Sequence, residues 1–241
     1  MRVLFIALLS GVILTLTSCH YFMGERVSGN GHITSQQRNI GNFEGVEASG
    51  QVVVHVRQDA STSVKIETDE NLQDLIEVFT SGNKLVIRTR QGYNLDPSGH
   101  IIAYVSAPAF KDIDLSGQCD IVGDSPLSGT EPLSMHVSGQ GDITLEVNLP
   151  KVSTEISGQG NVKLKGQVAD FSASVSGQGD VKCFDLVTEN TSVDISGGSD
   201  VEITANKQLT IEASGSSSVR YKGNASVSQS ISGSGSVKKV G

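Results

Sequence analysis

The chain of 241 residues is acidic, with 26 Asp and Glu against 18 Lys and Arg and a formal net charge of −8. Because phosphate binding needs a concentrated basic face, this composition argues against nucleic acid as a partner. Glycine is frequent at 27 residues, tryptophan is absent and aromatic residues make up 5%, so small aliphatic side chains must fill the core.

The first residues are typical of a secretory signal peptide. Arg2 precedes an apolar run over residues 3–16, which is too short to span a hydrocarbon core of about 30 Å as a helix. The run ends in Leu-Thr-Ser-Cys at residues 16–19, which resembles a bacterial lipobox, where the cysteine receives the lipid. We predict a signal peptide over residues 1–18 and lipidation of Cys19. The alternative is a non-lipidated signal whose cleavage leaves this cysteine free.

Residues 19–39 are expected to form the lipid anchor and a linker. Two or more acyl chains anchor a protein stably without a membrane-spanning helix. The segment 20–25 lacks the basic cluster that favours anionic headgroups, so the lipid itself should make the membrane contact. Loss of the signal removes Arg2 and no acidic residue, which gives a formal charge of −9. These features predict a lipid-anchored protein of the bacterial cell envelope, at the outer membrane, on its periplasmic or its outer side.

Residues 40–114 have the less regular pattern of the two halves. Residues 28–33 and 48–52 look like degenerate copies of a Ser-Gly motif that recurs further along the chain. We expect irregular, wide coils over residues 40–114, with residues 71–79 as a short helical turn or a strand and residues 91–100 as a loop.

A motif of the form aliphatic-Ser-Gly-x-x-Asp-aliphatic recurs seven times over residues 115–241, with some variation at the Asp position. Its copies are 18 to 22 residues apart, and the stretches between them alternate in polarity with a period of two. A period near twenty without a helical pattern predicts one solenoid coil per repeat. The first glycines of the copies are Gly117, Gly139, Gly158, Gly177, Gly197, Gly215 and Gly233.

The predicted fold is therefore all-β, a single-stranded β-helix (β-solenoid) that forms one domain over residues 40–241, with regular coils over residues 115–241. At each corner, glycine supplies backbone angles that are closed to other residues, and Asp or Asn hydrogen-bonds the local backbone. The predicted turn positions are Gly117, Asp120, Gly139, Asp142, Gly158, Asn161, Gly177, Asp180, Gly197 and Asp200.

Coils stacked about 4.8 Å apart place equivalent residues in ladders. Two inward ladders are expected, one of Leu115, Val137, Ile156, Val175, Ile195 and Ile231, and the other of Ile121, Ile143, Val162, Val181, Val201, Val219 and Val237. A row of Gln118, Gln140, Gln159 and Gln178 is interpreted as an amide ladder between coils rather than as a row that binds ligand.

The motif carboxylates are interpreted as turn-forming groups rather than calcium ligands. Asn161 interrupts the acidic row, and calcium takes six to eight oxygen ligands. The sequence holds no Gly-x-Ser-x-Gly elbow, and its five histidines lack metal-ligand spacing, so we predict no catalytic residue, no cofactor and no metal site. Cys119 and Cys183 should lie about three coils apart, roughly 14 Å at strand spacing, and are predicted as free thiols because a disulfide needs a closer approach.

Four features together resemble the head GIN domain family of auto-transporter adhesins, which is common in lipoproteins of the Bacteroidetes. They are Phe-Glu-Gly-Val at residues 43–46, Val-Val-Val-His-Val at 52–56, Asn-Lys-Leu-Val-Ile at 83–87 and the Ser-Gly-Gln-Gly-Asp copies. The resemblance covers about residues 40–225 and implies a right-handed, pectin-lyase-like β-helix with a role in adhesion. Cys119 replaces a motif glycine and the last two copies lack Asp, so a role that needs a complete acidic row is not expected.

The leading functional hypothesis is a non-enzymatic, lipid-anchored scaffold that binds an unknown protein or glycan at the cell envelope. The alternative is a carbohydrate-binding or carbohydrate-active β-helix with its site in the less regular half. Tyr93 is the best candidate there for sugar contact, although an aromatic loop anchor is the more common role. A third hypothesis is homo-oligomerisation through the terminal coils.

Overall fold

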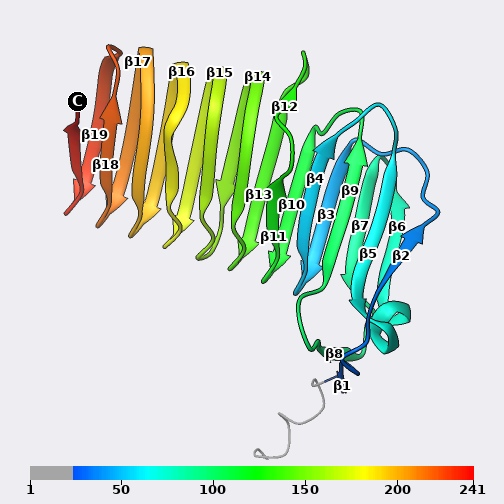
Figure 1. Ribbon diagram of the computed structural model, residues 1–241. Helices are drawn as coiled ribbons and strands as arrows, with labels where there is room; N and C mark the ends of the chain where they lie inside the picture. The colour runs from blue at the N-terminus through cyan, green and yellow to red at the C-terminus, as the bar shows by residue number, and fades with distance from the viewer. Residues whose placement is uncertain (1–23) are drawn as a thin grey trace, which may run out of the picture.

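The structure is a computed structural model that describes residues 24–241, so the predicted signal peptide and Cys19 lie outside the described residues. The chain forms a β-solenoid of about six turns, and its coils stack in parallel along one axis (Figure 1). This is the predicted fold class. Four long strands make up the regular coils, namely β14 (Ile143–Ile156), β15 (Val162–Gly177), β16 (Val181–Gly197) and β17 (Asp200–Gly215).

Each long strand bends once, so its first half lies in one sheet and its second half in another, and we call these the leading sheet and the trailing sheet. The leading sheet also contains β4 (Val53–Gln58), β11 (Asp120–Gly123), β18 (Ser218–Lys222) and β20 (Ser236–Lys239). The trailing sheet also contains β3 (Gly45–Gly50), β10 (Asp112–Gly117), β13 (Leu133–Gly139) and β19 (Ser226–Gly233). The short β12 (Leu127–Ser128) pairs with β14.

Every coil therefore has two corners. The glycine corner joins a trailing strand to the next leading strand and carries the repeated motif. The opposite corner, at the bend inside each long strand, carries no repeated motif. Side chains alternate between buried and exposed along both halves, which gives the solenoid a dry interior between the two sheets.

The two predicted aliphatic ladders both run through this interior. Strand pairing places their members in register, and all but the last member of each are buried. Ala213 completes the first ladder between Ile195 and Ile231. Ile231 remains 37% exposed and Val237 is only partly buried, because both lie in the last coil that the structure describes.

Antiparallel strands, rather than wide coils, form most of residues 59–111. Beyond the first coil, β7 (Lys84–Thr89) and β9 (Ile102–Ala107) still pair in parallel with β3 and β4. The strands outside them, β6 (Ile76–Ser81) and β5 (Ser63–Asp69), run antiparallel, and β2 (Ile33–Arg38) adds antiparallel to β5. This corrects the expectation for residues 40–114, of which only β3 and β4 follow the coil pattern.

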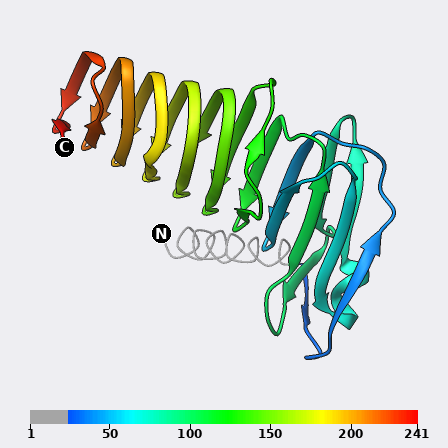
Figure 2. The ribbon, with the colours of Figure 1, turned by 45° about the horizontal axis from the view of Figure 1, so that its top comes forward.

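The physical reason is that this stretch lacks the repeated glycine corner and uses tight reversals instead. In the turn between β6 and β7, Gly82 has a φ of 59°, a left-handed angle that other residues rarely adopt. The resulting cap covers one end of the solenoid (Figure 2). Residues 71–79 contain the end of a 3₁₀ helix, Glu70–Leu75, followed by β6, and the expected loop at residues 91–100 contains β8 (Tyr93–Asp96).

The segment expected to be a linker is largely part of the cap. β1 (Glu25–Ser28) pairs in parallel with β8, and the degenerate motif copy at residues 28–33 does not join the stack. The buried Asp69 carboxylate accepts hydrogen bonds from the Gly31 N–H at 2.7 Å and from Ser98. Burial alone would raise the pKa of Asp69, but these hydrogen bonds hold it below its usual value.

Candidate functional site

The repeated corner glycines lie where successive backbones touch. At Gly139, Gly158, Gly177 and Gly197 an added Cβ would lie 2.1–2.3 Å from the carbonyl oxygen of the preceding corner glycine. No side chain fits at such a distance, so these positions require glycine for close approach between coils. The predicted role of these residues was local backbone angle, but contact between coils is the stricter constraint.

The motif Asp and Asn side chains also act between coils rather than within the local turn. The Oδ1 atoms of Asp120, Asp142, Asn161 and Asp180 each accept the backbone N–H of the equivalent residue in the next coil, at 2.9, 3.0, 3.3 and 3.1 Å. The expected local hydrogen bond is therefore corrected to a ladder along the axis. Since one oxygen of each group is used in this way, the row fits a structural role.

Three successive amide hydrogen bonds join Gln51, Gln118, Gln140 and Gln159, with N···O distances of 3.0, 3.2 and 3.0 Å. The amide ladder expected from sequence is present, but it begins one coil earlier. Among residues 24–241, Gln178 makes no side-chain hydrogen bond to it. These amides bind one another, so the glycine corner offers few polar groups that lack a partner.

Strand pairing gathers one group of potential metal ligands that the histidine spacing did not reveal. Ligand atoms of Asp112, Asp114 and His136 lie within 4.8 Å of one another on the trailing sheet. The Lys84 ammonium binds both carboxylates, at 2.9 Å from Asp112, and these contacts raise the pKa of the lysine. A divalent cation would have to displace this ammonium. The 22-residue step that separates the first two corner glycines also separates Asp114 from His136, so the repeat itself held the signal.

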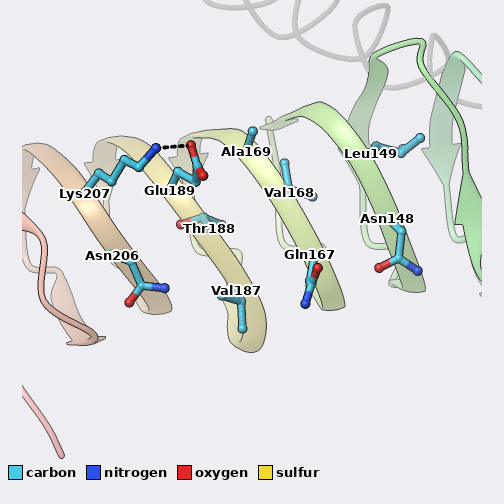
Figure 3. Close-up of a pocket in the computed structure, with 10 residues that line it drawn as sticks. All are labelled: Asn148, Leu149, Gln167, Val168, Ala169, Val187, Thr188, Glu189, Asn206 and Lys207. Atoms are coloured by element: carbon cyan, nitrogen blue, oxygen red, sulfur yellow. Dashed lines mark hydrogen bonds and ion pairs between the residues drawn. The ribbon is translucent and has the colours of Figure 1, made fainter.

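A groove of about 560 Å³ crosses β14 to β17 at the corner opposite the glycines (Figure 3). Asn148, Gln167 and Val187 are register partners there, and they point to the same side of the ribbon as Asn206. Leu149 and Val168 add apolar surface to the lining. The groove therefore presents amides and an aliphatic side chain in a row along the solenoid axis.

The groove forms where the pairing of coils becomes irregular. The register shifts between Lys163 and Gly166 on β15, and again on either side of Val187 on β16. The buried Thr188 hydroxyl fixes this irregular backbone, because it bonds the Thr191 hydroxyl at 2.6 Å and the Thr204 carbonyl at 2.8 Å. Val187 is consequently turned outward and is 43% exposed.

The groove amides differ from the amides of the glycine corner. Within residues 24–241, the side chains of Asn148, Gln167 and Asn206 make no hydrogen bond, whereas the glutamines of the ladder bind one another. The carboxylate of Glu189 is the only one that lines the groove in this part of the chain, and Lys207 binds it at 2.7 Å. The site therefore offers neutral hydrogen-bonding groups, and it lacks the pair of carboxylates that glycoside hydrolysis uses.

Two further expectations fall outside the groove. Tyr93 is half-buried, lies in β8 and packs against the hydrophobic core, as an anchor rather than as a sugar platform. Cys119 and Cys183 are buried free thiols. Desolvation raises the pKa of Cys119 to about 11 and that of Cys183 to about 12, so both are unreactive near neutral pH.

The family whose description reads "Putative auto-transporter adhesin, head GIN domain" matches residues 42–225. The chain belongs to this family. The resemblance expected from sequence is therefore confirmed. The head GIN domain includes β3, the groove and most of the regular coils, and its family description indicates a protein of the cell surface or envelope. The relatives are described as adhesins rather than enzymes. No curated protein matches the chain.

Solved structures share the fold of this head GIN domain at low sequence identity. A "putative adhesin" from Bacteroides fragilis NCTC 9343 has a TM-score of 0.83 at 20% identity, covering 89% of this chain and 100% of its own. A "putative lipid binding protein" from Parabacteroides distasonis ATCC 8503 has a TM-score of 0.72 at 22% identity, covering 90% and 100%. A "putative adhesin" from the same strain has a TM-score of 0.71 at 23% identity, with the same coverage. No helix within residues 24–241 is both long and apolar enough to cross a membrane.

Proposed function

We propose that the protein is a non-enzymatic adhesion scaffold of the bacterial envelope, anchored by lipid at Cys19, and that it holds an extended glycan in the groove of β14 to β17. The observation that carries this proposal is the row of Asn148, Gln167 and Val187, whose polar members have no side-chain partner among the described residues. In a solenoid whose other repeated amides bind one another, this row is the exception.

The chemistry of the groove favours a neutral sugar polymer. Amides donate to and accept from hydroxyl groups, while Val187, Leu149 and Val168 suit the apolar face of a sugar ring. Coils repeat every 4.8 Å or so, a step comparable to one ring of an extended polysaccharide. The one charged pair in the lining, Glu189 and Lys207, is already neutralised, which argues against a strongly charged ligand.

Two other ligand classes fit less well. An extended peptide binds a sheet by adding a strand, but the backbone groups of β15 and β16 are already used in pairing with neighbouring coils. A lipid chain needs an enclosed apolar cavity, whereas this groove is open and lined in part by amides. The lipid binding named for one structural neighbour is therefore not carried over to this site.

A carbohydrate-active enzyme is the alternative, and the groove supports it less than simple binding. The lining residues supply one carboxylate, Glu189, and an ion pair engages it. The groove also lies in the regular coils, whereas a site for this alternative was expected in the less regular half. Without a ring-stacking aromatic residue, each site should bind weakly, and several copies on one surface would then supply the avidity that adhesion needs.

The test is a glycan array probed with the chain produced from residue 20 onward, followed by calorimetry on the best glycan. Loss of two neutral hydrogen bonds in an Asn148→Ala, Gln167→Ala double variant should weaken binding by about tenfold or more. The matched control is Gln118→Ala, Gln140→Ala, which removes two amides from the glycine corner and should leave binding unchanged. Equal loss in both variants, or release of reducing sugar from the bound glycan, would count against this function.

A further inference from the structure

Two pairs of like charges face each other across neighbouring coils. On the trailing sheet, Asp194 and Glu212 are direct register partners, and both are exposed. On the leading sheet, Lys163 and Lys182 are direct register partners, and both are exposed. Like charges directly opposite each other on adjacent strands are destabilising. Each pair is therefore a cost to the fold that its own sheet does not explain.

These four charges are poorly compensated within the molecule, in contrast to most others on the same faces. Within residues 24–241, Asp194, Glu212 and Lys163 make no ion pair, and Lys182 has only Asp180 at 3.4 Å. Elsewhere on the two faces, charges are paired. Examples are Lys165 with Glu146 at 2.9 Å, Arg220 with Glu202, and His136 with Glu155 at 3.3 Å.

The surroundings of the acidic pair allow close approach by another surface. Its neighbours on the outward side of the trailing sheet are small hydroxyl residues, so the two carboxylates project beyond a flat floor. These neighbours are Ser174, Ser192, Ser196, Thr210, Ser214 and Ser230.

We propose that a second copy of this chain docks its leading face on this trailing face, displaced by one coil, so that its Lys163 meets Asp194 and its Lys182 meets Glu212. The charges are complementary in sign. Both pairs have the same separation of one coil, about 4.8 Å, because each spans two adjacent strands of a parallel sheet. Both pairs also lie near the glycine corner of their coils, so they stand at similar heights when two solenoids lie side by side.

The one-coil displacement follows from the rest of the charge pattern. With that displacement, Glu202 of the second copy lies opposite Ser230 and Thr144 lies opposite Ser174, so no like charges meet. Without displacement, Glu202 would face Glu212. Displacement by one coil in the other direction would place Glu202 against Asp194. Only the first arrangement matches two charge pairs and opposes none.

This contact has a defined geometry at a membrane. The two axes are parallel and point the same way, so both caps lie on the same side, as anchoring in one bilayer requires. The contact joins different faces, so each copy keeps one leading and one trailing face free, and the association extends into rows.

Zero-length carbodiimide cross-linking of the full-length protein, followed by mass spectrometry, tests the contact directly. Lys163 and Asp194 lie on opposite outer faces of one molecule, so a bond between them reports a contact between copies. We expect Lys163–Asp194 and Lys182–Glu212 links in low salt and a drop on the order of tenfold at 0.5 M salt, because exposed charge pairs are screened. Absence of both links in low salt overturns the proposal.

A charge exchange distinguishes this contact from non-specific attraction. The Asp194→Lys, Glu212→Lys variant and the Lys163→Glu, Lys182→Glu variant should each fail to cross-link alone, and an equimolar mixture should recover the links. Recovery also shows that both variants are folded. The control exchanges the internal pair of the leading face, Glu146→Lys with Lys165→Glu, and should behave as wild type. Cross-linking of either single variant at the wild-type level, or an unrescued mixture of variants with wild-type circular dichroism, overturns the proposal.

Discussion

Asp142 and Asn161 occupy equivalent positions in successive coils, and both accept a backbone N–H from the coil that follows, although only one is charged. The motif therefore selects an acceptor of a certain length rather than a carboxylate. Sequence analysis identified these positions correctly but assigned the hydrogen bond to the local turn. The motif shows which residues recur, whereas the partner of each oxygen depends on the offset between stacked coils, which a single repeat does not contain.

A substitution at one corner glycine separates contact between coils from backbone angle. Gly158 lies outside the left-handed region, yet its added Cβ would meet the Gly139 carbonyl oxygen at 2.3 Å. We expect Gly158→Ala to lower the free energy of unfolding by roughly 1–3 kcal/mol, because rigid backbone atoms must move apart.

Urea denaturation of the chain from residue 20 onward measures this change. The matched control is Gly41→Ala, where nothing lies within 4 Å of the added Cβ. Equal stability of the two variants would mean that the coils are not in contact at the glycine corner.

At the scale of the strand, the regular coils were predictable and the groove was not recognised. The motif recurs at steps of 19, 19, 20 and 18 residues from Gly139 to Gly215, and equal steps predict strands in register. The coil that holds Val187 is the one of 20 residues, and its extra length causes the irregular pairing on β16. The signal was present in the spacing, but which residue turns outward depends on how the backbone absorbs the extra length.

The buried thiols give the strands a pH dependence. Burial raises the pKa of Cys119 to about 11 and of Cys183 to about 12, from an ordinary value of 9.0. The folded state therefore favours the protonated thiols. Their contribution to stability is complete below pH 9 and is lost as the pH rises toward 11 or 12.

We expect wild-type protein to lose more stability between pH 8 and pH 11 than a Cys119→Ala, Cys183→Ala variant does, as measured by thermal melting. The double variant serves as the control because tyrosine and lysine titrate in the same range in both proteins. Parallel pH profiles would show that the thiols are accessible to water in the native state.

At the scale of the whole molecule, the stack was predicted because repetition forces it, while the cap was not. Residues 59–111 lack a repeat, so nothing in their pattern distinguishes a wide parallel coil from the antiparallel pairing of β2, β5 and β6. The same limit applied to residues 25–38, which were expected as linker and instead supply two paired strands.

The lipid anchor is the remaining prediction at this scale, and Cys19 lies outside the described residues. We expect cells that produce the wild-type chain to incorporate labelled palmitate into it, and Cys19→Ala to abolish the label, because the thiol is the acceptor. Cys119→Ala is the matched control and should retain the label. Palmitate incorporation into the Cys19→Ala chain would place the lipid elsewhere.

The cap fixes where the folded chain starts, because β1 and β8 pair beside it at one end of the stack. Three coil steps separate β4 from β15, which places the start of the groove about 14 Å along the axis from the first coil. Each additional coil before β14 would move that groove outward by one further step without altering its lining. The number of repeats thus sets the height at which a ligand is held above the attached end, and relatives with more or fewer coils would reach different depths of the layer that surrounds the cell.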